Sequence, residues 1–247
     1  MDKARNEVRD GGVGFQTTHW SLVMQARAKG SSDAGAALET LCRTYWRPIF
    51  HFIRARGYQS DEAQDLTQEF FYTVIDKGYF DQADENRGRF RTFLKTAIKN
   101  FLANQWKKSK RQKRGGEIDF CSFDEFEEDR FQASNSADAS PDKAYDQQWA
   151  RTTFESTLDR VREEMAERGH LERFEIYKPH LMPRASGSSY AEAAASVNMT
   201  EQAFKSGIRR FRERVRMFFL QAVADTVSSP QDAESEAREL MKAMTQV

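Results

Sequence analysis

The chain has 247 residues, and its 38 lysine and arginine side chains equal its 38 aspartate and glutamate side chains, so the formal net charge is zero. This balance excludes a protein whose whole surface is basic, but it permits basic and acidic segments that alternate along the chain. Charged residues make up 31% and hydrophobic residues 39%, which favours small domains joined by exposed segments over one large core.

Apolar residues recur at helical spacing along most of the chain and no strand pattern appears, so the sequence predicts an all-α fold. Residues 1–16 lack such a pattern, and we expect them to be disordered. A short helix is expected over about 17–30. A second is expected over 34–56, with a kink or a restart at Pro48, because proline cannot donate the helical hydrogen bond.

A third helix is expected over 60–77, because Ser60 can cap it and acidic residues occupy its first turn. Its segment DLTQEFF (65–71) places three polar side chains on one face, opposite the apolar positions. They are Asp65, Gln68 and Glu69. The plain interpretation of this patch is a solvent-exposed helix face, which composition alone favours.

A fourth helix is expected over 88–111, within a segment (86–114) of eleven basic residues and no acidic one. Apolar side chains cover one face, and the other carries a stripe of basic and carboxamide side chains. The stripe consists of Arg91, Lys95, Lys99, Asn100, Asn104, Lys107, Lys108 and Arg111. Lysine and arginine neutralise phosphates and asparagine can hydrogen-bond base edges, so the stripe predicts nucleic-acid binding.

The alternative for this helix is an ordinary solvated amphipathic helix. Nucleic-acid binding also requires that the lysine and arginine side chains of the stripe are not permanently paired with the chain's own acidic side chains. The aromatic residues Phe90, Phe93 and Phe101 are expected in the core rather than stacked on bases.

Residues 112–142 are expected to form a flexible linker rich in glycine, serine and acidic residues. Its segment 117–142 has a net charge of −8 and directly follows the basic segment. We therefore hypothesise that the linker folds onto the basic stripe in the free protein. The acids expected to make this contact are Asp124, Glu125, Glu127, Glu128 and Asp129.

Helical patterns resume after the linker, over about 143–168 and 171–181. At the end of the chain, a tail (228–247) is expected to hold a weak acidic helix at 231–245.

Between these segments the pattern is typical of a helix-turn-helix: a short helix from Ser189, a turn at 196–199 and a basic helix over 200–227. Six side chains are expected to project from the second helix: Gln202, Lys205, Ser206, Arg209, Arg210 and Arg212. A plain helical hairpin has the same hydrophobic spacing and stays open as an alternative.

No enzyme or metal-site motif appears, so we expect no catalytic residue, no metal and no cofactor. The four histidines are scattered without ligand spacing. The two cysteines, Cys42 and Cys121, are too few for a disulfide framework or a CxxC zinc site and fit a reducing cytosol. The start, MDKARNEVRDGG, has no apolar core, and MFFL (217–220) is far too short to span a membrane, so a cytoplasmic protein is expected.

Over 35–227 the chain resembles a bacterial RNA polymerase sigma factor of the extracytoplasmic-function (ECF) type. The resemblance rests on the order of DLTQEFF, the basic helix GRFRTFLKTAIKNFLANQWKKSKR, a linker and SYAEAAASVNMTEQAFKSGIRRFRERVR. It implies two small helical domains joined by the acidic linker. They are a sigma region-two-like domain at 17–111 and a region-four-like helix-turn-helix domain at 143–227.

The resemblance further implies that the chain binds core RNA polymerase and directs promoter recognition, DNA melting and transcription initiation. The patch at 65–69 would dock on the clamp coiled coil of the largest polymerase subunit, and the flap is a further polymerase contact. The stripe would read the minus-ten element and hold its melted single strand. The helix 200–216 would read the minus-thirty-five element in duplex DNA, although Gly207 stands where the family commonly has a basic residue.

Two other functions stay open. The chain can be a helix-turn-helix DNA-binding transcriptional regulator that acts without being a polymerase subunit, or a helical adaptor with no nucleic-acid role. Polymerase association tests the first, and salt-dependent binding of single-stranded DNA tests the second. An unidentified anti-sigma factor is a further partner that such a protein can have.

Overall fold

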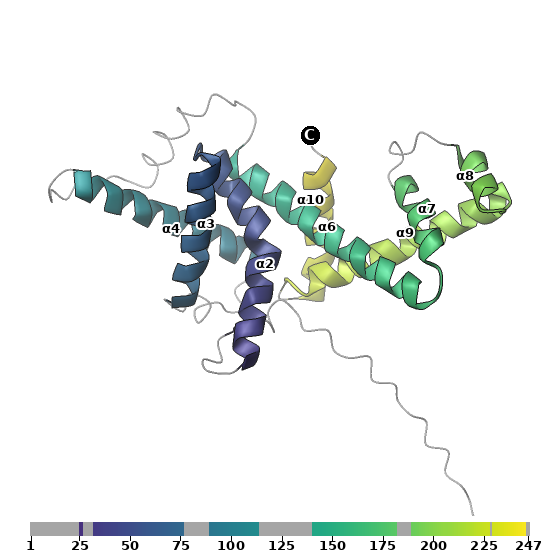
Figure 1. Cartoon of the computed structure of the whole chain (residues 1–247), viewed down its shortest axis with the longest axis horizontal. Helices are drawn as coiled ribbons and strands as arrows, with labels where there is room; N and C mark the ends of the chain where they lie inside the picture. The colour runs from purple at the N-terminus through teal and green to yellow at the C-terminus, as the bar shows by residue number, and fades with distance from the viewer. Residues whose placement is uncertain are drawn as a thin grey trace, which may run out of the picture.

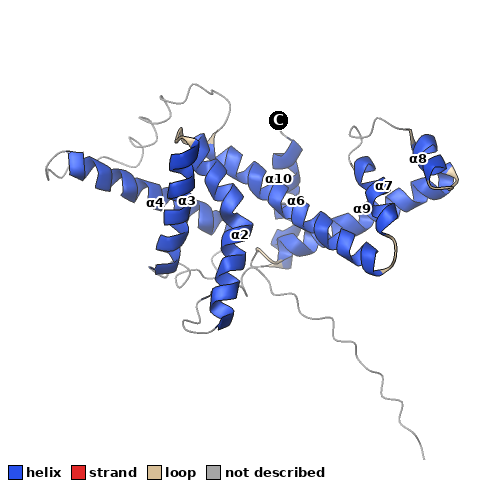
Figure 2. Ribbon diagram, viewed as in Figure 1, coloured by secondary structure: helices blue, strands red, loops and turns tan. Residues whose placement is uncertain are grey.

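The computed structural model describes residues 25–26, 32–76, 89–113, 140–181, 189–227 and 229–245, and every regular element in them is a helix (Figures 1 and 2). The predicted all-α fold is confirmed. Most of the expected helix over 17–30 lies outside the described residues. In chain order the helices are α2 (Ser32–Ala55), α3 (Ser60–Asp76), α4 (Phe90–Lys113), α6 (Pro141–Glu167), α7 (Leu171–Tyr177), the 3₁₀ helix η3 (Lys178–His180), α8 (Tyr190–Ser196), α9 (Glu201–Ala224) and α10 (Pro230–Thr245).

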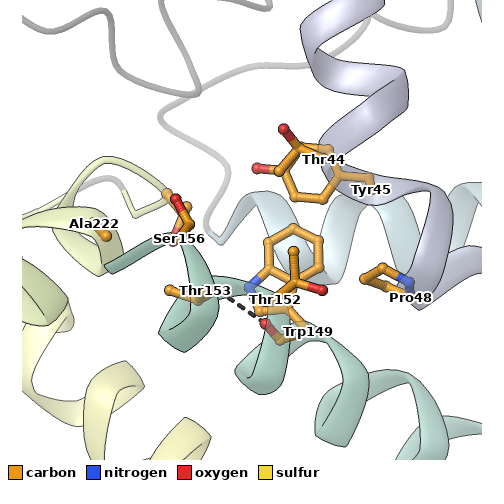
Figure 3. Close-up of a pocket in the computed structure, with 9 residues that line it drawn as sticks. Thr44, Tyr45, Pro48, Trp149, Thr152, Thr153, Ser156 and Ala222 are labelled. Atoms are coloured by element: carbon orange, nitrogen blue, oxygen red, sulfur yellow. Dashed lines mark hydrogen bonds between the residues drawn. The ribbon is translucent and has the colours of Figure 1, made fainter. Parts of the chain in front are cut away.

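The helix α2 is continuous across Pro48, so the restart that the sequence predicts there does not occur. Pro48 is buried and lines a small cavity of about 30 Å³ with Tyr45 of the same helix and Trp149 of α6 (Figure 3). The rings of Tyr45 and Trp149 are stacked, with their centroids 4.5 Å apart. Packing against α6 therefore holds the helix together where its own hydrogen bonding is interrupted.

The larger hydrophobic cluster lies where α2, α3 and α4 meet the first half of α6, the end of α9 and α10. Among its fully buried side chains are Phe52 of α2, Phe70 of α3 and Phe90 of α4. Full burial of such a side chain contributes roughly 1.5–3 kcal/mol relative to exposure. The apolar face of α4 is therefore anchored in the core independently of its basic face.

The second hydrophobic cluster includes residues of the helix-turn-helix, and α6 and α9 take part in both clusters. Figure 1 shows these two long helices running between the two groups of helices. The buried members of the second cluster are Val161, Phe174, Tyr177, Ala193, Ala194, Phe204, Ile208, Phe211 and Val215. The start of α6 and the end of α9 belong to the first cluster, because Trp149 and Phe219 are buried there. The predicted second domain thus shares its long helices with the first, and the exact division into domains stays a prediction.

The structure has a helix, a turn and a helix in the places predicted for the helix-turn-helix. The Ser189 hydroxyl accepts a hydrogen bond from the Glu192 amide at 3.2 Å, and the Glu192 carboxylate accepts one from the Ser189 amide at 2.8 Å. Asn198 turns the chain with a φ of 54°. The Thr200 hydroxyl then accepts from the Ala203 amide at 3.2 Å. These local bonds fix where each helix begins.

Gly207 of α9 is buried against Tyr177 of α7. A Cβ atom at this position would lie 2.7 Å from Cζ of Tyr177, well inside contact distance. The glycine therefore leaves room for the Tyr177 ring against α9, and a larger side chain fits here only if that ring moves. This packing is a physical reason for the departure from the family pattern at residue 207.

Replacing Gly207 by alanine is expected to lower the melting temperature, because overpacking costs about 1–3 kcal/mol and opposes a helix-propensity gain of only about 1 kcal/mol. Gly35→Ala is the matched control, since Gly35 is an exposed helical glycine with nothing within 4 Å of its Cβ position. Thermal unfolding followed by circular dichroism compares the two. A Gly207→Ala chain as stable as the control would contradict the close packing on Tyr177.

Candidate nucleic-acid and polymerase interface

The helix α4 separates an apolar face from the predicted stripe. Phe90, Leu94 and Ile98 are buried, as is Phe101, while Phe93 is half-buried and stacks on Phe90 with centroids 6.0 Å apart. The prediction that these phenylalanines serve the core is confirmed for Phe90 and Phe101. The stripe on the other face is therefore the part of α4 that can meet a partner.

Arg91 is the buried end of the stripe, with a side chain only 8% exposed. Its Nε and Nη2 atoms donate to the Glu236 carboxylate of α10 at 2.6 and 2.9 Å, and Nη1 donates to Asp146 of α6 at 2.5 Å. Glu239 lies 3.2 Å from Nη2. Burial alone lowers the pKa of Arg91, but the hydrogen bonds and charges of Glu236 and Asp146 outweigh it and raise this pKa above its usual value.

Lys95 and Lys99 continue the stripe, one helical turn apart, and meet acids in the first turns of α6. The Nζ atom of Lys95 lies 2.8 Å from Asp146, and that of Lys99 lies 2.9 Å from Asp142. Lys95 also lies 3.8 Å from Asp142. The exposed fraction of the basic side chains rises from 8% at Arg91 to 19% at Lys95 and 27% at Lys99. The ion pairs thus become more solvent-accessible along the stripe.

The next part of the stripe is open to solvent. Asn100, Asn104, Lys107 and Lys108 are exposed, and their side chains have no hydrogen-bond or ion-pair partner among the described residues. The side chain of Arg111 lies outside the described part of the chain. The predicted nucleic-acid surface therefore has a first half that is paired with the chain's own acids and a second half whose described side chains have no partner within the described ranges.

The acids that hold the stripe are only partly those of the linker hypothesis. Asp142, the end of the acidic segment, does pair with the stripe, whereas residues 124–129 lie outside the described residues. Asp146, Glu236 and Glu239 were not predicted as partners. The sequence shows that Glu236 and Glu239 lie on an acidic helix. It does not show that Glu236 pairs with Arg91, which is 145 residues away in the chain.

Arg89, at the start of α4, is a further member of the cluster that the predicted stripe does not include. Its Nη1 atom lies 2.6 Å from Glu236 and 2.6 Å from Glu239, and its Nη2 atom donates to the Ser235 hydroxyl at 3.1 Å. The Phe90 amide also donates to the Thr226 carbonyl at 2.9 Å. The start of α4 is therefore fixed to α10 and to the turn that precedes it.

The polar patch of α3 faces solvent. Asp65 and Gln68 are exposed without a side-chain partner in the described part of the chain, while the exposed Glu69 accepts a hydrogen bond from Gln105 of α4. Phe70, on the opposite side of the helix, is fully buried. The patch is thus a surface with two unengaged side chains, held beside the open half of α4 by the third.

On α9, five of the six predicted side chains are exposed: Gln202, Lys205, Ser206, Arg209 and Arg210. Lys205 pairs with Glu201 at 2.7 Å, and Arg209 pairs with Glu213 at 3.0 Å. Such exposed pairs within one helix contribute only about 0.3–0.5 kcal/mol, so the bases remain available to phosphates.

Arg212 differs from the other predicted side chains of α9. It is half-buried, and its Nη2 atom donates to the His180 carbonyl at 2.7 Å and to the Tyr190 hydroxyl at 3.3 Å. In this structure Arg212 thus joins η3 and α8 to α9 rather than projecting as the sequence predicts.

A basic cleft of about 330 Å³ lies beside α9, and sequence reasoning missed it because its bases come from separate helices and the turn between two of them. Its basic lining consists of Arg168, His170, Arg173, Arg210 and Arg214, around an apolar part that includes Tyr177 and Phe211. Arg168 and Arg214 share the Glu164 carboxylate. Arg173 and Arg210 have no ion-pair partner among the described residues, so the cleft keeps a positive charge next to the helix-turn-helix.

No group of three or more histidine, cysteine, aspartate or glutamate side chains within the described ranges could hold a metal ion. No helix in these ranges is both long and apolar enough to cross a membrane. The thiol of Cys42 is half-buried in α2, and burial raises its pKa to about 11, so it stays protonated at neutral pH.

Comparison with known proteins gives one family match for this region. Residues 41–112 match the Sigma-70 region 2 family, and this range contains most of α2, all of α3 and nearly all of α4. It ends before the helix-turn-helix. No curated protein and no solved structure matches the chain. This match covers less than half of the chain and supports a sigma factor, the class of non-enzymatic subunit that binds core RNA polymerase and promoter DNA in transcription initiation.

Proposed function

We propose that the chain is a sigma factor of the ECF type, with α4 holding the melted minus-ten strand and α9 reading the minus-thirty-five element. The observation that carries this proposal is the open half of α4. Within the matched domain, Asn100, Asn104, Lys107 and Lys108 turn carboxamide and ammonium groups to solvent beside a rigid apolar face. The sigma factor breaks no covalent bond; it supplies sequence choice and strand capture, while the polymerase performs the catalysis.

The chemistry of these side chains suits a melted strand. Opening duplex DNA costs about 1.4 kcal/mol for each stacking step, so several steps cost several kcal/mol. Capture of flipped bases by protein groups offsets part of that cost. Asn100 and Asn104 lie one helical turn apart and can hydrogen-bond unpaired bases. Lys107 and Lys108 follow on the next turn and can bind phosphates of the same strand.

The α8–α9 unit is the proposed reader of duplex DNA. In a helix-turn-helix the second helix lies in the major groove and its first turns contact base edges. Gln202, Lys205 and Ser206 lie on these turns and are exposed. Arg173 and Arg210 of the basic cleft can hold the phosphates at the edge of the groove.

The proposed polymerase contact is the α3 patch. Asp65 and Gln68 are exposed and unengaged within the described part of the chain, which is what a docking surface needs. Under this proposal the patch meets the clamp coiled coil of the largest polymerase subunit, and the flap is a second polymerase contact. A regulator that uses the helix-turn-helix without entering the polymerase has no use for this patch.

Substitution of the patch tests polymerase binding. Asp65→Arg combined with Gln68→Ala is expected to weaken co-purification with core polymerase by about tenfold or more, because a repulsive charge in an interface costs several kcal/mol. Both side chains are exposed, so the fold is expected to stay intact. The control is Glu39→Arg, an exposed acid on α2. Unchanged association would reject the polymerase-subunit proposal and favour the free regulator.

Two double variants distinguish the contacts that α4 makes with nucleobases from those that it makes with phosphates. Asn100→Ala with Asn104→Ala is expected to reduce the preference for a minus-ten single strand over a scrambled strand. Lys107→Ala with Lys108→Ala is expected to weaken both strands alike and to lower the salt slope by about 0.7 for each lost contact. Fluorescence anisotropy over a salt series measures both effects. Equal loss of preference in the two variants would contradict this division of labour.

A further inference from the structure

The basic stripe of α4 is half occupied, and the groups that occupy it come from outside the matched domain. Residues 41–112 supply Arg91, Lys95 and Lys99, whereas the acids that pair with them lie on α6 and α10. A segment added to a nucleic-acid-binding domain thus fills the positions where phosphates would bind.

We propose that this acidic face, formed by Asp142, Asp146, Glu236 and Glu239, is an internal competitor of nucleic acid. In the closed chain it holds the first half of the α4 stripe and must be displaced before α4 can bind a DNA strand along its whole length. The inference rests on the proposed function, because it assigns the stripe to DNA phosphates.

The geometry of the pairing is that of two matched rows. The bases of α4 follow one another at four-residue steps, and so do Asp142 and Asp146 of α6. Asp146 meets Arg91 and Lys95, while Asp142 meets Lys95 and Lys99. The acidic side chains of α6 therefore run antiparallel to the basic side chains of α4. They present negative charges at regular intervals, as the phosphates of a DNA strand do.

When DNA phosphates replace these carboxylates, every basic side chain of the stripe keeps an anionic partner. Removal of one partner from a buried ion pair is strongly unfavourable, because the other charge stays buried and uncompensated. A phosphate that replaces a carboxylate avoids this penalty, since the guanidinium fork of Arg91 binds both anions in a bidentate manner. The basic side chains of the closed cluster can thus stay paired when phosphates replace the acids.

The apolar face of α10 consists mainly of small or only partly buried side chains. Its buried face consists of Ala233, Ala237 and Leu240, with Met241 and Met244 partly buried against the first cluster. Alanine buries little apolar area, so the buried side chains of α10 are smaller than those of α2 and α4, although α10 packs closely on α6 and α9. The ion pairs of Glu236 and Glu239 therefore help to fix the position of α10 against the start of α4.

Exposure along the stripe predicts the order of release. Among the pairs between α4 and α6, Lys99 and Asp142 form the most exposed one, and Lys99 is adjacent to the exposed Asn100. A strand bound to the open half of α4 therefore reaches Asp142 first, Asp146 next and Glu236, which is fully buried, last.

The test compares two triple variants that change the net charge equally. The opening variant is Asp142→Asn, Asp146→Asn and Glu239→Gln, which leaves Glu236 to keep Arg91 paired. The control is Glu39→Gln, Glu155→Gln and Asp159→Asn, three exposed acids elsewhere on the surface. The full-length chains are titrated with a short fluorescein-labelled single-stranded DNA of mixed sequence over a salt series.

The opening variant is expected to bind about tenfold more tightly than the control at low salt, because a masked site lowers apparent affinity by the fraction that is open. Its salt slope is expected to be steeper by about 0.7 for each base released. Equal, measurable affinity in both variants overturns the inference and leaves nucleic-acid binding standing. Absence of binding in every variant overturns the proposed function as well.

Hydrogen exchange on the wild-type chain supplies an independent readout, since neutralised acids near a DNA site raise affinity even without displacement. Linkage requires that DNA which displaces the acids also loosens them. Amides of α10 are therefore expected to lose protection as the single strand is added. Unchanged protection of α10 at saturating DNA overturns the inference, whatever the affinities of the variants.

Discussion

The buried guanidinium of Arg91 is the constraint on which the arrangement of the helices depends. A charge this deeply enclosed is tolerated only where acids surround it, and here Asp146 comes from α6 and Glu236 from α10. These two acids bring elements far apart in sequence to the start of α4. Because α6 contributes residues to both hydrophobic clusters, the contact of Arg91 with Asp146 also helps to position the second cluster relative to the first.

A buried ion-pair cluster is a weak source of net stability but a strong determinant of register. The guanidinium of Arg91 donates to Glu236 from two nitrogen atoms and to Asp146 from a third, so sliding α10 or α6 by one residue breaks several bonds at once. Hydrophobic packing supplies most of the stability, as in the stacked pair of Tyr45 and Trp149. The charged cluster then selects one arrangement among those that bury similar apolar area.

The helices themselves could be predicted from local patterns. Apolar spacing, the cap at Thr200 and the acidic first turn of α3 act within a few residues, and they gave element limits close to those observed. The continuity of α2 at Pro48 could not be predicted this way, because it depends on Trp149 of a distant helix.

The candidate site divides along the same line. Exposure of Asn100, Lys107 and the α3 patch follows from helix periodicity, so those residues could be selected from the sequence. Pairing of Arg91 and Lys95 with acids could not, since charge composition does not say which opposite charges meet. The basic cleft was missed for the same reason: Arg173 and Arg210 belong to different helices and come together through the packing of α7 on α9.

The two long helices that join the clusters have a geometric consequence. The helix α9 spans 24 residues and is roughly 36 Å long at 1.5 Å per residue, with Phe204 in one cluster and Phe219 in the other. The length of α9 sets both the distance and the relative rotation of the two clusters. One residue inserted between these positions lengthens the span by only about 1.5 Å but turns everything beyond it by about 100°. An insertion within α9 therefore reorients one cluster relative to the other, whereas an insertion in a loop imposes no such rotation.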